Sequence, residues 1–413
     1  MRILVGIDPS KQHHQVSFLA DDPRRNGHRP RQLTITNDHS GFQRLLDRLN
    51  TYQAQGDHVE VAIEPSGHYW ENLSYFLHDH GYPPQLVNPF HVSRYTEIWD
   101  NTPTKTDPKD SQLVATLLRE GRTLYNNLPQ GAYAELRRLT TVRRDLLQER
   151  RRLRVKLHVW VDRYFPEYRR LFSDLAGPTS LGILAKYGGP KRIAQTPQAE
   201  LAQAVKQLSR GKLGETRARQ LKEQAAGSVG QTRAPRAAQL ELKLLIAKIR
   251  QNGLQVKQVE EAIQRTLREL SEAQRLETIP GVGWRSVAVF LGVVGPVSRY
   301  PRARSIEKLA GLNLWERSSG KHQGERHISR RGRSDLRQLA YQLAVCGMRH
   351  NDEFRAFYEE KLKRSGVKLK ALVALGAKML RVMYGVAKSQ QRYKRLAERQ
   401  QERNQAKAYE AMA

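Results

Sequence analysis

The stretch Lys105-Thr106-Asp107-Pro108-Lys109-Asp110-Ser111-Gln112 places two carboxylates at the point where a helix is expected to begin. Asp107 is a residue type favoured at the helix N-cap, and Pro108 is favoured at the first helical position. Asp110 then lies on the same helix face as Asp107, one turn further on. A capping pair alone would explain this pattern, so its meaning depends on the acids elsewhere in the chain.

Two further acids, Asp8 and Glu64, end apolar runs that have the character of strands, ILVGID and VEVAIE. An unpaired carboxylate in such surroundings is costly, although for Glu64 alone a surface position at a strand end is the alternative. Four carboxylates at one site repel one another unless cations lie among them, which is the requirement of a two-metal phosphodiester site. An all-oxygen ligand set favours Mg²⁺. The predicted catalytic and metal-binding acids are Asp8, Glu64, Asp107 and Asp110.

The net charge of +30 is distributed unevenly along the 413 residues. Residues 1–120 carry 12 Lys and Arg against 15 Asp and Glu, whereas residues 121–413 carry 59 against 26, a net charge of +33. The first part is expected to be a near-neutral folded unit with an acidic site, and the rest is expected to bind a polyanion. Nucleic acid is the expected partner, bound with a strong dependence on salt.

The composition, 39% hydrophobic and 27% charged, is typical of a globular protein. No run of about 18 apolar residues occurs, and the first residues have the pattern of a strand rather than of a signal peptide. A cytoplasmic protein with no membrane partner is therefore expected. Cys346, the single cysteine, excludes a disulfide framework within one chain, and its apolar helical surroundings predict a small core residue.

The N-terminal part is expected to alternate strands and helices in the order βββαβαβα. The expected strands cover residues 3–8, 15–20, 32–36, 59–64 and 85–87, and the expected helices cover residues 42–49 and 69–80 and the segment from residue 108. Acids at the ends of the first and fourth strands and on the last helix suit an RNase H-like fold, because strand ends face the crevice where such sheets bind ligands. The predicted fold class is an α/β RNase H-like domain followed by a helical coiled-coil region and a mainly α C-terminal domain.

Two long amphipathic segments follow, one from Glu135 to about Leu157 and one from about Arg236 to Leu270. They flank a small helical unit at residues 160–225, and their apolar stripes predict an antiparallel coiled-coil hairpin or an oligomerisation arm. The density of arginines on the first segment favours phosphate contact, with simple pairing of helices as the alternative. The expected contacts are Arg143, Arg144, Arg151 and Arg152.

Ile279-Pro280-Gly281-Val282-Gly283 has the form of a helix-hairpin-helix turn. Its glycines allow close backbone approach, and free amides at the next helix start can hold a phosphate, although a plain helix–helix turn is the alternative. The sequence Ser318-Ser319-Gly320 lies among arginines; it is compatible with an ordinary loop, and it also offers what a serine attacking a phosphate needs. The remaining expected nucleic-acid contacts are Lys105, Gly281, Gly283, Arg317, Lys321, Arg330, Arg331, Arg333 and Arg337. Residues 340–388 are expected to be helical, and residues 389–413 to be a polar, disordered tail.

These pieces together resemble the DEDD-type transposases of the insertion-sequence "one-ten" family. The matching motifs are GIDPSK, AIEPSGHYW, KTDPKDSQLVA, IPGVG, and the series AGL, SSG and ISRRGRSDLR. The resemblance implies a RuvC-like (RNase H-like) catalytic domain at residues 1–125 and a C-terminal transposase domain at residues 275–388. The basic helical region would cover residues 126–274, and the tail residues 389–413.

The resemblance also implies a mechanism for DNA transposition and recombination. Divalent metal is held by Asp8, Glu64, Asp107 and Asp110, and Ser319 forms a covalent link to DNA, with Ser318 as the alternative nucleophile. A structured bridge RNA pairs with donor and target DNA and selects both sites. A dimer or tetramer associated with the prokaryotic nucleoid is implied.

Three other functions stay open from the sequence. A hydrolytic RuvC-like nuclease would use only the acidic site and would form no covalent protein–DNA adduct. A sugar kinase or related ATPase shares the G-I-D-x-S-K pattern, but it requires a second phosphate-binding glycine loop and leaves the charge of +33 unexplained. A non-enzymatic nucleic-acid scaffold would tolerate substitution of any of the four acids.

Overall fold

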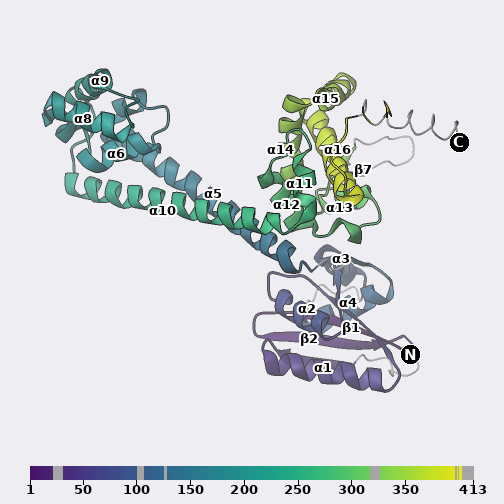
Figure 1. Cartoon of the computed structure of the whole chain (residues 1–413). Coiled ribbons are helices and arrows are strands. Elements are labelled where there is room, and N and C mark those ends of the chain that lie inside the picture. The colour runs from purple at the N-terminus through teal and green to yellow at the C-terminus, as the bar shows by residue number, and fades with distance from the viewer. Residues whose placement is uncertain are drawn as a thin grey trace. The chain divides into compact units, whose positions relative to one another are not determined.

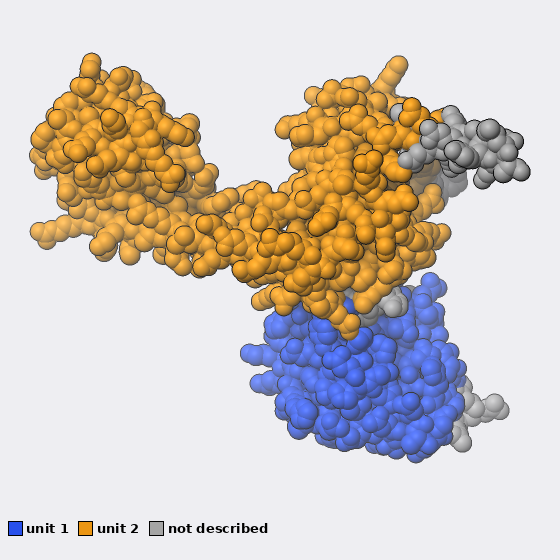
Figure 2. Space-filling model, in the orientation of Figure 1, with its two compact units in different colours: residues 1–128 blue, residues 129–413 orange. Residues whose placement is uncertain are grey.

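The computed structural model describes residues 1–21, 31–99, 107–124, 128–316, 326–395, 398, 400 and 401, without the side chains of residues 97–99, 107 and 108. The expectations for Lys105, Arg317, Ser318, Ser319 and Lys321 lie outside the described residues, as does the side chain of Asp107. The chain divides into two compact units, the N-terminal unit Met1–Leu128 and the C-terminal unit Pro129–Ala413 (Figure 2).

The N-terminal unit contains a mixed sheet, two strands of which, β1 and β2, are labelled in Figure 1. Its described residues form six strands in the order β3-β2-β1-β4-β5-β6. The strands are β1 (Arg2–Pro9), β2 (His13–Ala20), β3 (Arg31–Thr36), β4 (His58–Ile63), β5 (Gln85–Val87) and β6 (Thr123–Leu124). β1, β4 and β5 are parallel neighbours, whereas β2, β3 and β6 each pair antiparallel with a neighbour. The five expected strands are confirmed, and β6, with two residues, is too short for a periodic sequence signal.

Helices cover both faces of this sheet. On one face, α1 (His39–Ala54) and α2 (Trp70–Asp79) share a core with Ile7 of β1. On the other face, α4 (Asp107–Arg119) shares a second core with Leu4 of β1. Alternate residues of β1 therefore point to opposite faces, as the two-residue period of a strand requires.

One helix of the N-terminal unit, α3 (Pro89–Trp99), was not predicted from the sequence. No helix was expected between the strand at residues 85–87 and the helix from residue 108. Proline is favoured at the first position of a helix, and Asn88 Oδ1 accepts a hydrogen bond of 3.0 Å from Phe90 N at this helix start. The same two residues thus end the strand and begin the helix.

Gly6 marks the place where α4 meets the sheet. A Cβ atom here would lie 2.2 Å from Ser111 O and 2.3 Å from Ala115 N, far inside van der Waals contact. Only glycine therefore lets the backbone of the helix rest directly on β1. The buried hydroxyls of Ser17 on β2 and Ser111 on α4 form a hydrogen bond of 2.8 Å, which holds the first turns of α4 at a second point.

The C-terminal unit is built on an antiparallel pair of long helices (Figure 1). The pair consists of α5 (Gly131–Tyr164) and α10 (Pro235–Arg268). Trp160 Nε1 near the end of α5 donates to Ala238 O near the start of α10, and Asn252 Nδ2 donates to Leu146 O, each at 3.0 Å. The predicted helical hairpin is confirmed, and α5 extends beyond the expected residues 135–157 at both ends.

A helical head, residues 165–234, joins the two long helices. Its described elements are η2 (Pro166–Arg170), α6 (Pro178–Tyr187), α7 (Pro190–Gln195), α8 (Gln198–Leu208) and α9 (Glu215–Ala226). Phe165 and Tyr168 are fully buried in its core, together with Leu157 of α5 and Leu242 of α10. The small helical unit expected between the long segments is therefore present.

A second core lies at the other end of the helix pair. It contains Leu136 of α5 and Ile263 of α10, packed with the helices that follow. These elements are α11 (Ser271–Glu277), α12 (Trp284–Val294), η3 (Val297–Arg299), α13 (Ala303–Leu309), β7 (Leu314–Trp315), β8 (His327–Ile328), α14 (Ser334–His350), α15 (Asp352–Ser365) and α16 (Lys368–Ser389). The helix pair thus connects two separate apolar cores of one unit.

The structure corrects the expectation for Cys346, which is exposed rather than buried. The buried face of α14 runs through Leu336, Leu339, Leu343 and Gly347 at helical spacing, and Cys346 lies off that stripe. The apolar run therefore correctly predicted that Cys346 lies on a helix, but wrongly predicted that it lies on the buried face of that helix. Among the described residues, no helix is long and apolar enough to cross a membrane.

Residues 390–395, expected to begin the polar tail, pack onto the C-terminal unit. Gln390 follows α16 with a left-handed φ of 54°, which turns the chain back. Tyr393 N donates to Thr278 Oγ1 at 2.8 Å, and the Tyr393 ring lies 6.0 Å from the ring of Phe354. The folded part of the chain therefore continues beyond the end of α16.

Candidate functional site

Asp8 and Glu64 each come directly after one of two paired residues on adjacent parallel strands. The last paired residues of β1 and β4 are Ile7 and Ile63, and Glu64 N donates to Ile7 O at 3.1 Å. Ile7 and Ile63 both lie in the core beneath α1 and α2. Because side chains alternate along a strand, Asp8 and Glu64 belong to the opposite face, the one covered by α4.

Asp110 lies on that same face, in the first turn of α4. The close approach of Gly6 to Ser111 fixes this turn against β1, and Gly6 lies two residues before Asp8 on that strand. Asp110 is buried, with 2% of its surface exposed, and Glu64 is similarly buried at 9%. The backbone thus brings three of the four predicted acids to one edge and one face of the sheet.

Ser66 is a residue of this edge that the sequence interpretation did not single out. Its hydroxyl donates a hydrogen bond of 3.0 Å to Glu64 Oε1. A hydrogen bond to a carboxylate oxygen fixes the orientation of the side chain. The signal was available in the motif AIEPSGHYW, in which the serine follows the acid by two residues.

The oxygen-only donor set of these acids fits a hard divalent cation such as Mg²⁺. Two of the carboxylates follow paired residues of neighbouring strands, and a third lies in the first turn of the helix on the same face. Within the described side chains, however, no group of three or more His, Cys, Asp or Glu stands together as metal ligands. Assembly of the complete four-acid site therefore stays a prediction.

The glycines of the predicted helix-hairpin-helix turn differ in their surroundings. Gly281 has a φ of +83°, and a Cβ atom there would lie 2.9 Å from Gly347 Cα, so this glycine serves the packing of the turn on α14. A Cβ atom at Gly283, the N-cap of α12, would meet open space. Gly283 is therefore the better placed of the two to present backbone amides to a phosphate.

Arg143, one of the arginines expected to contact phosphate, shares an ion-pair partner within the protein with Arg285. Arg143 Nη2 lies 2.7 Å from Glu260 Oε1, and Arg285 Nη2 lies 3.0 Å from Glu260 Oε2. Hydrogen bonds from Arg285 and Arg143 hold the pKa of Glu260 below its ordinary value. Arg143 thus ties α5 to α10, the role that the helix-pairing alternative assigns to it.

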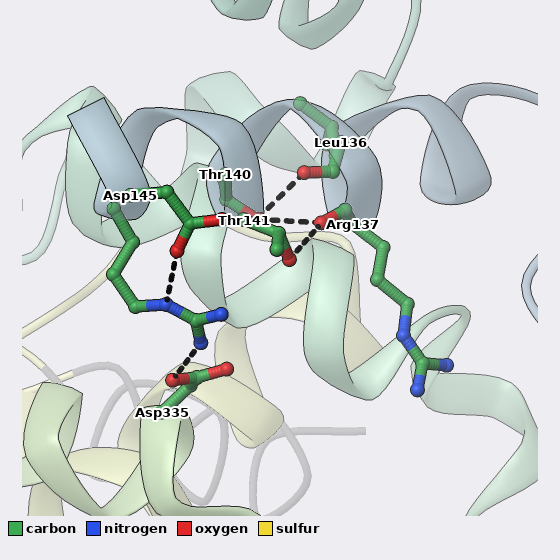
Figure 3. A network of polar contacts seen from close by, with 7 residues as sticks. Leu136, Arg137, Thr140, Thr141, Asp145 and Asp335 are labelled. Atoms are coloured by element: carbon green, nitrogen blue, oxygen red, sulfur yellow. Dashed lines mark hydrogen bonds and ion pairs between the residues drawn. The ribbon is translucent and has the colours of Figure 1, made fainter. Parts of the chain in front are cut away.

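Arg144 ties α5 to α14, and Figure 3 labels its two carboxylate partners, Asp145 and Asp335. It donates to Asp335 at 2.6 Å and to Asp145 at 3.5 Å, and the hydrogen bond to Asp335 raises the pKa of the guanidinium. Arg151 and Arg152, further along α5, are exposed. The exposed pair is therefore better placed than Arg143 and Arg144 to meet a nucleic acid.

The C-terminal basic run begins in the second strand of a short β-hairpin. β7 and β8 pair antiparallel, and residues 317–325, including Ser319, lie between them in the sequence. Arg330, Arg331 and Arg333 are exposed. The three residues therefore offer positive charge at the base of this hairpin.

Arg337 has a different role at the same base. Its Nη1 donates to Ala310 O at 3.0 Å and to Arg330 O at 3.3 Å. At Gly332, a Cβ atom would lie 2.4 Å from Leu309 O, so the backbone at Gly332 directly contacts the end of α13. Arg337 thus holds together the segments at the base of the hairpin. Its position in a run of arginines did not indicate this structural role.

A mixed α/β unit with acids at strand ends, joined to a strongly basic helical unit, is expected of a metal-dependent enzyme that acts on nucleic acid. Comparison with known proteins identifies the protein as a transposase. Residues 5–166 match a family model described as "Transposase", that of the IS110-type DEDD transposases. Residues 273–359 match the model described as "Transposase IS116/IS110/IS902 family". The chain belongs to this family. Transposases cut and rejoin DNA, so the protein is an enzyme of DNA strand cleavage and rejoining.

Individual relatives agree with this assignment. The chain is 27% identical to the insertion element IS116 uncharacterized 44.8 kDa protein of Streptomyces clavuligerus, over 93% of this chain and 94% of that protein. It is 25% identical to the mini-circle putative transposase for IS117 of Streptomyces coelicolor, over 78% of each chain. It is also 27% identical to a pilin gene-inverting protein of Moraxella bovis, over 41% of this chain and 52% of that protein.

Proposed function

We propose that this transposase cuts and rejoins donor and target DNA through a serine-linked covalent intermediate, at a Mg²⁺-dependent site formed by Asp8, Glu64, Asp107 and Asp110. The observation that carries the proposal is the in-register placement of Asp8 and Glu64 beneath the first turn of α4. The sheet order β3-β2-β1-β4-β5 supports an RNase H-like fold for the N-terminal unit.

Each residue of the acidic site has a defined task. Asp8 and Glu64 hold their oxygens at neighbouring strand ends, Ser66 orients Glu64, and α4 carries Asp110 to the same face. Divalent metal bound by these oxygens supplies Lewis acidity at the phosphate and stabilises charge on the leaving oxygen. The packing at Gly6 keeps the helix, and with it Asp110, in a fixed position relative to the strand ends.

Ser319 supplies the nucleophile, with Ser318 as the alternative. The Ser319 hydroxyl oxygen forms a bond to phosphorus, the bond to one DNA sugar oxygen breaks, and the proton lost by the serine is balanced by the one gained by that oxygen. In the second step, a sugar hydroxyl of the partner strand displaces the serine. The number of phosphodiester links is conserved, so strand exchange requires no ATP.

A structured bridge RNA selects the donor and target sites in this proposal. The family resemblance is its basis, and the net charge of +33 over residues 121–413 supports a polyanionic partner. Exposed arginines such as Arg151, Arg152 and Arg331 are candidates for contact with a phosphate backbone. A homo-oligomer, in which the serine of one subunit meets the acids of another, is part of the same proposal.

The test is a denaturing gel of the protein incubated with guide RNA, Mg²⁺ and labelled DNA. Wild-type protein should give a covalent protein–DNA adduct, Ser319→Ala should give none, and Ser318→Ala should retain it. Asp110→Asn and removal of Mg²⁺ by a chelator should both abolish the adduct. Asp79→Asn, an acid-to-amide change at an exposed position of the same unit, should leave it intact.

The outcomes separate the possible mechanisms. An adduct that survives Ser319→Ala rejects the assignment of the nucleophile. Cleavage that depends on Asp110 but never yields an adduct favours a hydrolytic RuvC-like nuclease. Mixing inactive Ser319→Ala with inactive Asp8→Ala tests the shared site, since partial recovery of recombination requires the two subunits to complement each other.

A further inference from the structure

A cavity of about 550 Å³ lies between α15, α16 and the stretch 390–395, and none of its lining residues is assigned a role above. Its described lining includes four cationic side chains and no acidic one. The lining residues are Phe357, Lys378, Arg381, Val382, Gly385, Val386, Ser389, Gln391, Arg392 and Lys394. Its volume falls within the range of small-ligand pockets.

One wall of the cavity is fixed by Tyr393. The side chain of Tyr393 packs on Phe354 and its OH donates to Glu353 Oε2 at 3.3 Å, while its backbone is held by Thr278. These contacts join α11, α15 and the end of the chain that follows α16. They hold Arg392 and Lys394, one on each side of Tyr393, against the cavity.

The opposite wall is the face of α16. Lys378 is half-buried, and its Nζ lies 4.2 Å from the ring centroid of Phe357. Burial lowers the pKa of this lysine, although the carboxylates of Glu353 and Glu360 act in the other direction. Arg381, one turn further on, is held by Glu307 at 2.7 Å. A partly desolvated ammonium beside an oriented guanidinium gains strongly from an anionic ligand.

The rest of the lining is suited to a nucleobase. Val382 and Val386 provide an apolar surface, and Ser389 and Gln391 provide hydrogen-bonding groups at its margin. Gly385 lies between the two valines on α16, and a Cβ atom there would meet open space. The glycine therefore leaves room in the cavity where any other residue would fill it.

We infer that this cavity binds a single unstacked nucleotide, with the phosphate at Lys378 and Arg381 and the base against Val382 and Val386. This site goes beyond the proposed function, which assigns no role to α16 or to residues 390–395. A nucleotide within a single strand and a free nucleotide share the required chemistry. Unpaired nucleotides of a nucleic-acid strand are the source that best fits a strongly basic unit.

The test uses the full chain and two probes that carry a photoreactive thiothymine, a 5′-phosphorylated trinucleotide and the 5′-mononucleotide. Wild-type protein should form cross-links that mass spectrometry maps to α16 or residues 390–395. Preference for the trinucleotide identifies a strand as the ligand, and equal binding identifies a free nucleotide; both support the pocket. Cross-links that map only elsewhere overturn it.

Gly385→Leu tests the cavity without changing charge. Leucine has a higher helix propensity than glycine, so the variant should unfold at no lower temperature than wild type, while its affinity for the trinucleotide should fall about tenfold or more. Gly253→Leu is the matched control, because Gly253 also lies in a long helix and faces open space. Wild-type affinity in Gly385→Leu overturns the inference.

Lys378→Gln tests the charge. Its effect should be similar to that of Gly385→Leu, whereas Lys368→Gln, at an exposed position of the same helix, should change the affinity little. Equal losses in Lys378→Gln and Lys368→Gln would show that the probe responds only to the overall charge of the protein, which also overturns the inference.

Discussion

Replacement of Gly6 by alanine is the most direct test of how the acidic edge is built. The added Cβ atom would lie 2.2 Å from Ser111 O and 2.3 Å from Ala115 N, and both of these are backbone atoms that cannot rotate away. To restore an ordinary separation of about 3.5 Å, the start of α4 must move from β1 by on the order of 1 Å. Overpacking of this kind costs about 1–3 kcal/mol.

The displacement should affect function more than stability. For a unit of this size, a loss of 1–3 kcal/mol lowers the melting temperature by roughly 3–15 °C, so folded protein remains available for assay. A catalytic group misplaced by about 1 Å costs on the order of a hundredfold in rate. We therefore expect Gly6→Ala to reduce DNA cleavage about a hundredfold at a temperature where circular dichroism shows a folded protein.

Gly253→Ala is the control, since its Cβ atom meets open space in a helix and should leave both measurements at or above wild type. Gly6→Ala with an unchanged melting temperature and full cleavage activity would refute the direct packing of α4 on β1. Loss of folding without selective loss of activity at lower temperature would refute the link between this packing and the acids.

Three further predictions concern the remainder of the chain. Affinity for nucleic acid should fall by about 10³–10⁵ between 50 and 200 mM salt if about 6–10 phosphates are contacted, and a flat response would contradict the basic surface as the binding face. Arg337→Met should lower the free energy of unfolding by about 1–3 kcal/mol through loss of its bond to Ala310 O, whereas exposed Arg349→Met on the same helix should not; equal effects would reject the structural role of Arg337. Burial lowers the pKa of His14, so the unfolded chain binds a proton more readily and the stability of the N-terminal unit should fall as pH drops below about 6.5. Urea titrations at a series of pH values should show a weaker acid dependence in His14→Gln, and an identical dependence would exclude His14 as the cause.

The sequence was sufficient to locate five of the six described strands of the sheet and two of the acids, because both depend on local patterns. Apolar runs of the right length predicted β1 and β4, and Asp8 and Glu64 were placed at or next to their ends. Parallel pairing then brings these ends together without further information. The helical hairpin was predictable for a similar reason, since its apolar stripes extend over many turns.

Contacts between distant residues could not be predicted in this way. The arginines of α5 suggested phosphate binding, but the partners of Arg143 and Arg144 lie 117 and 191 residues away in the sequence. The packing role of Gly6 depends on which helix covers the sheet, and a glycine in a strand gives no indication of that. Cys346 shows the same limit, because an apolar run reveals a helix but leaves its buried face uncertain.

The antiparallel pair of α5 and α10 restricts how such a protein can change during evolution. Each helix is about 50 Å long, and the bonds from Trp160 to Ala238 and from Asn252 to Leu146 fix the register between them. An insertion in one helix must therefore be matched in the other, in steps of about seven residues or 10 Å, if the apolar seam is to survive. The head at the far end is free of this restriction. The family models match residues 5–166 and 273–359 and leave nearly all of the head between them, so the head is the part of the chain where relatives are expected to differ most in sequence and size.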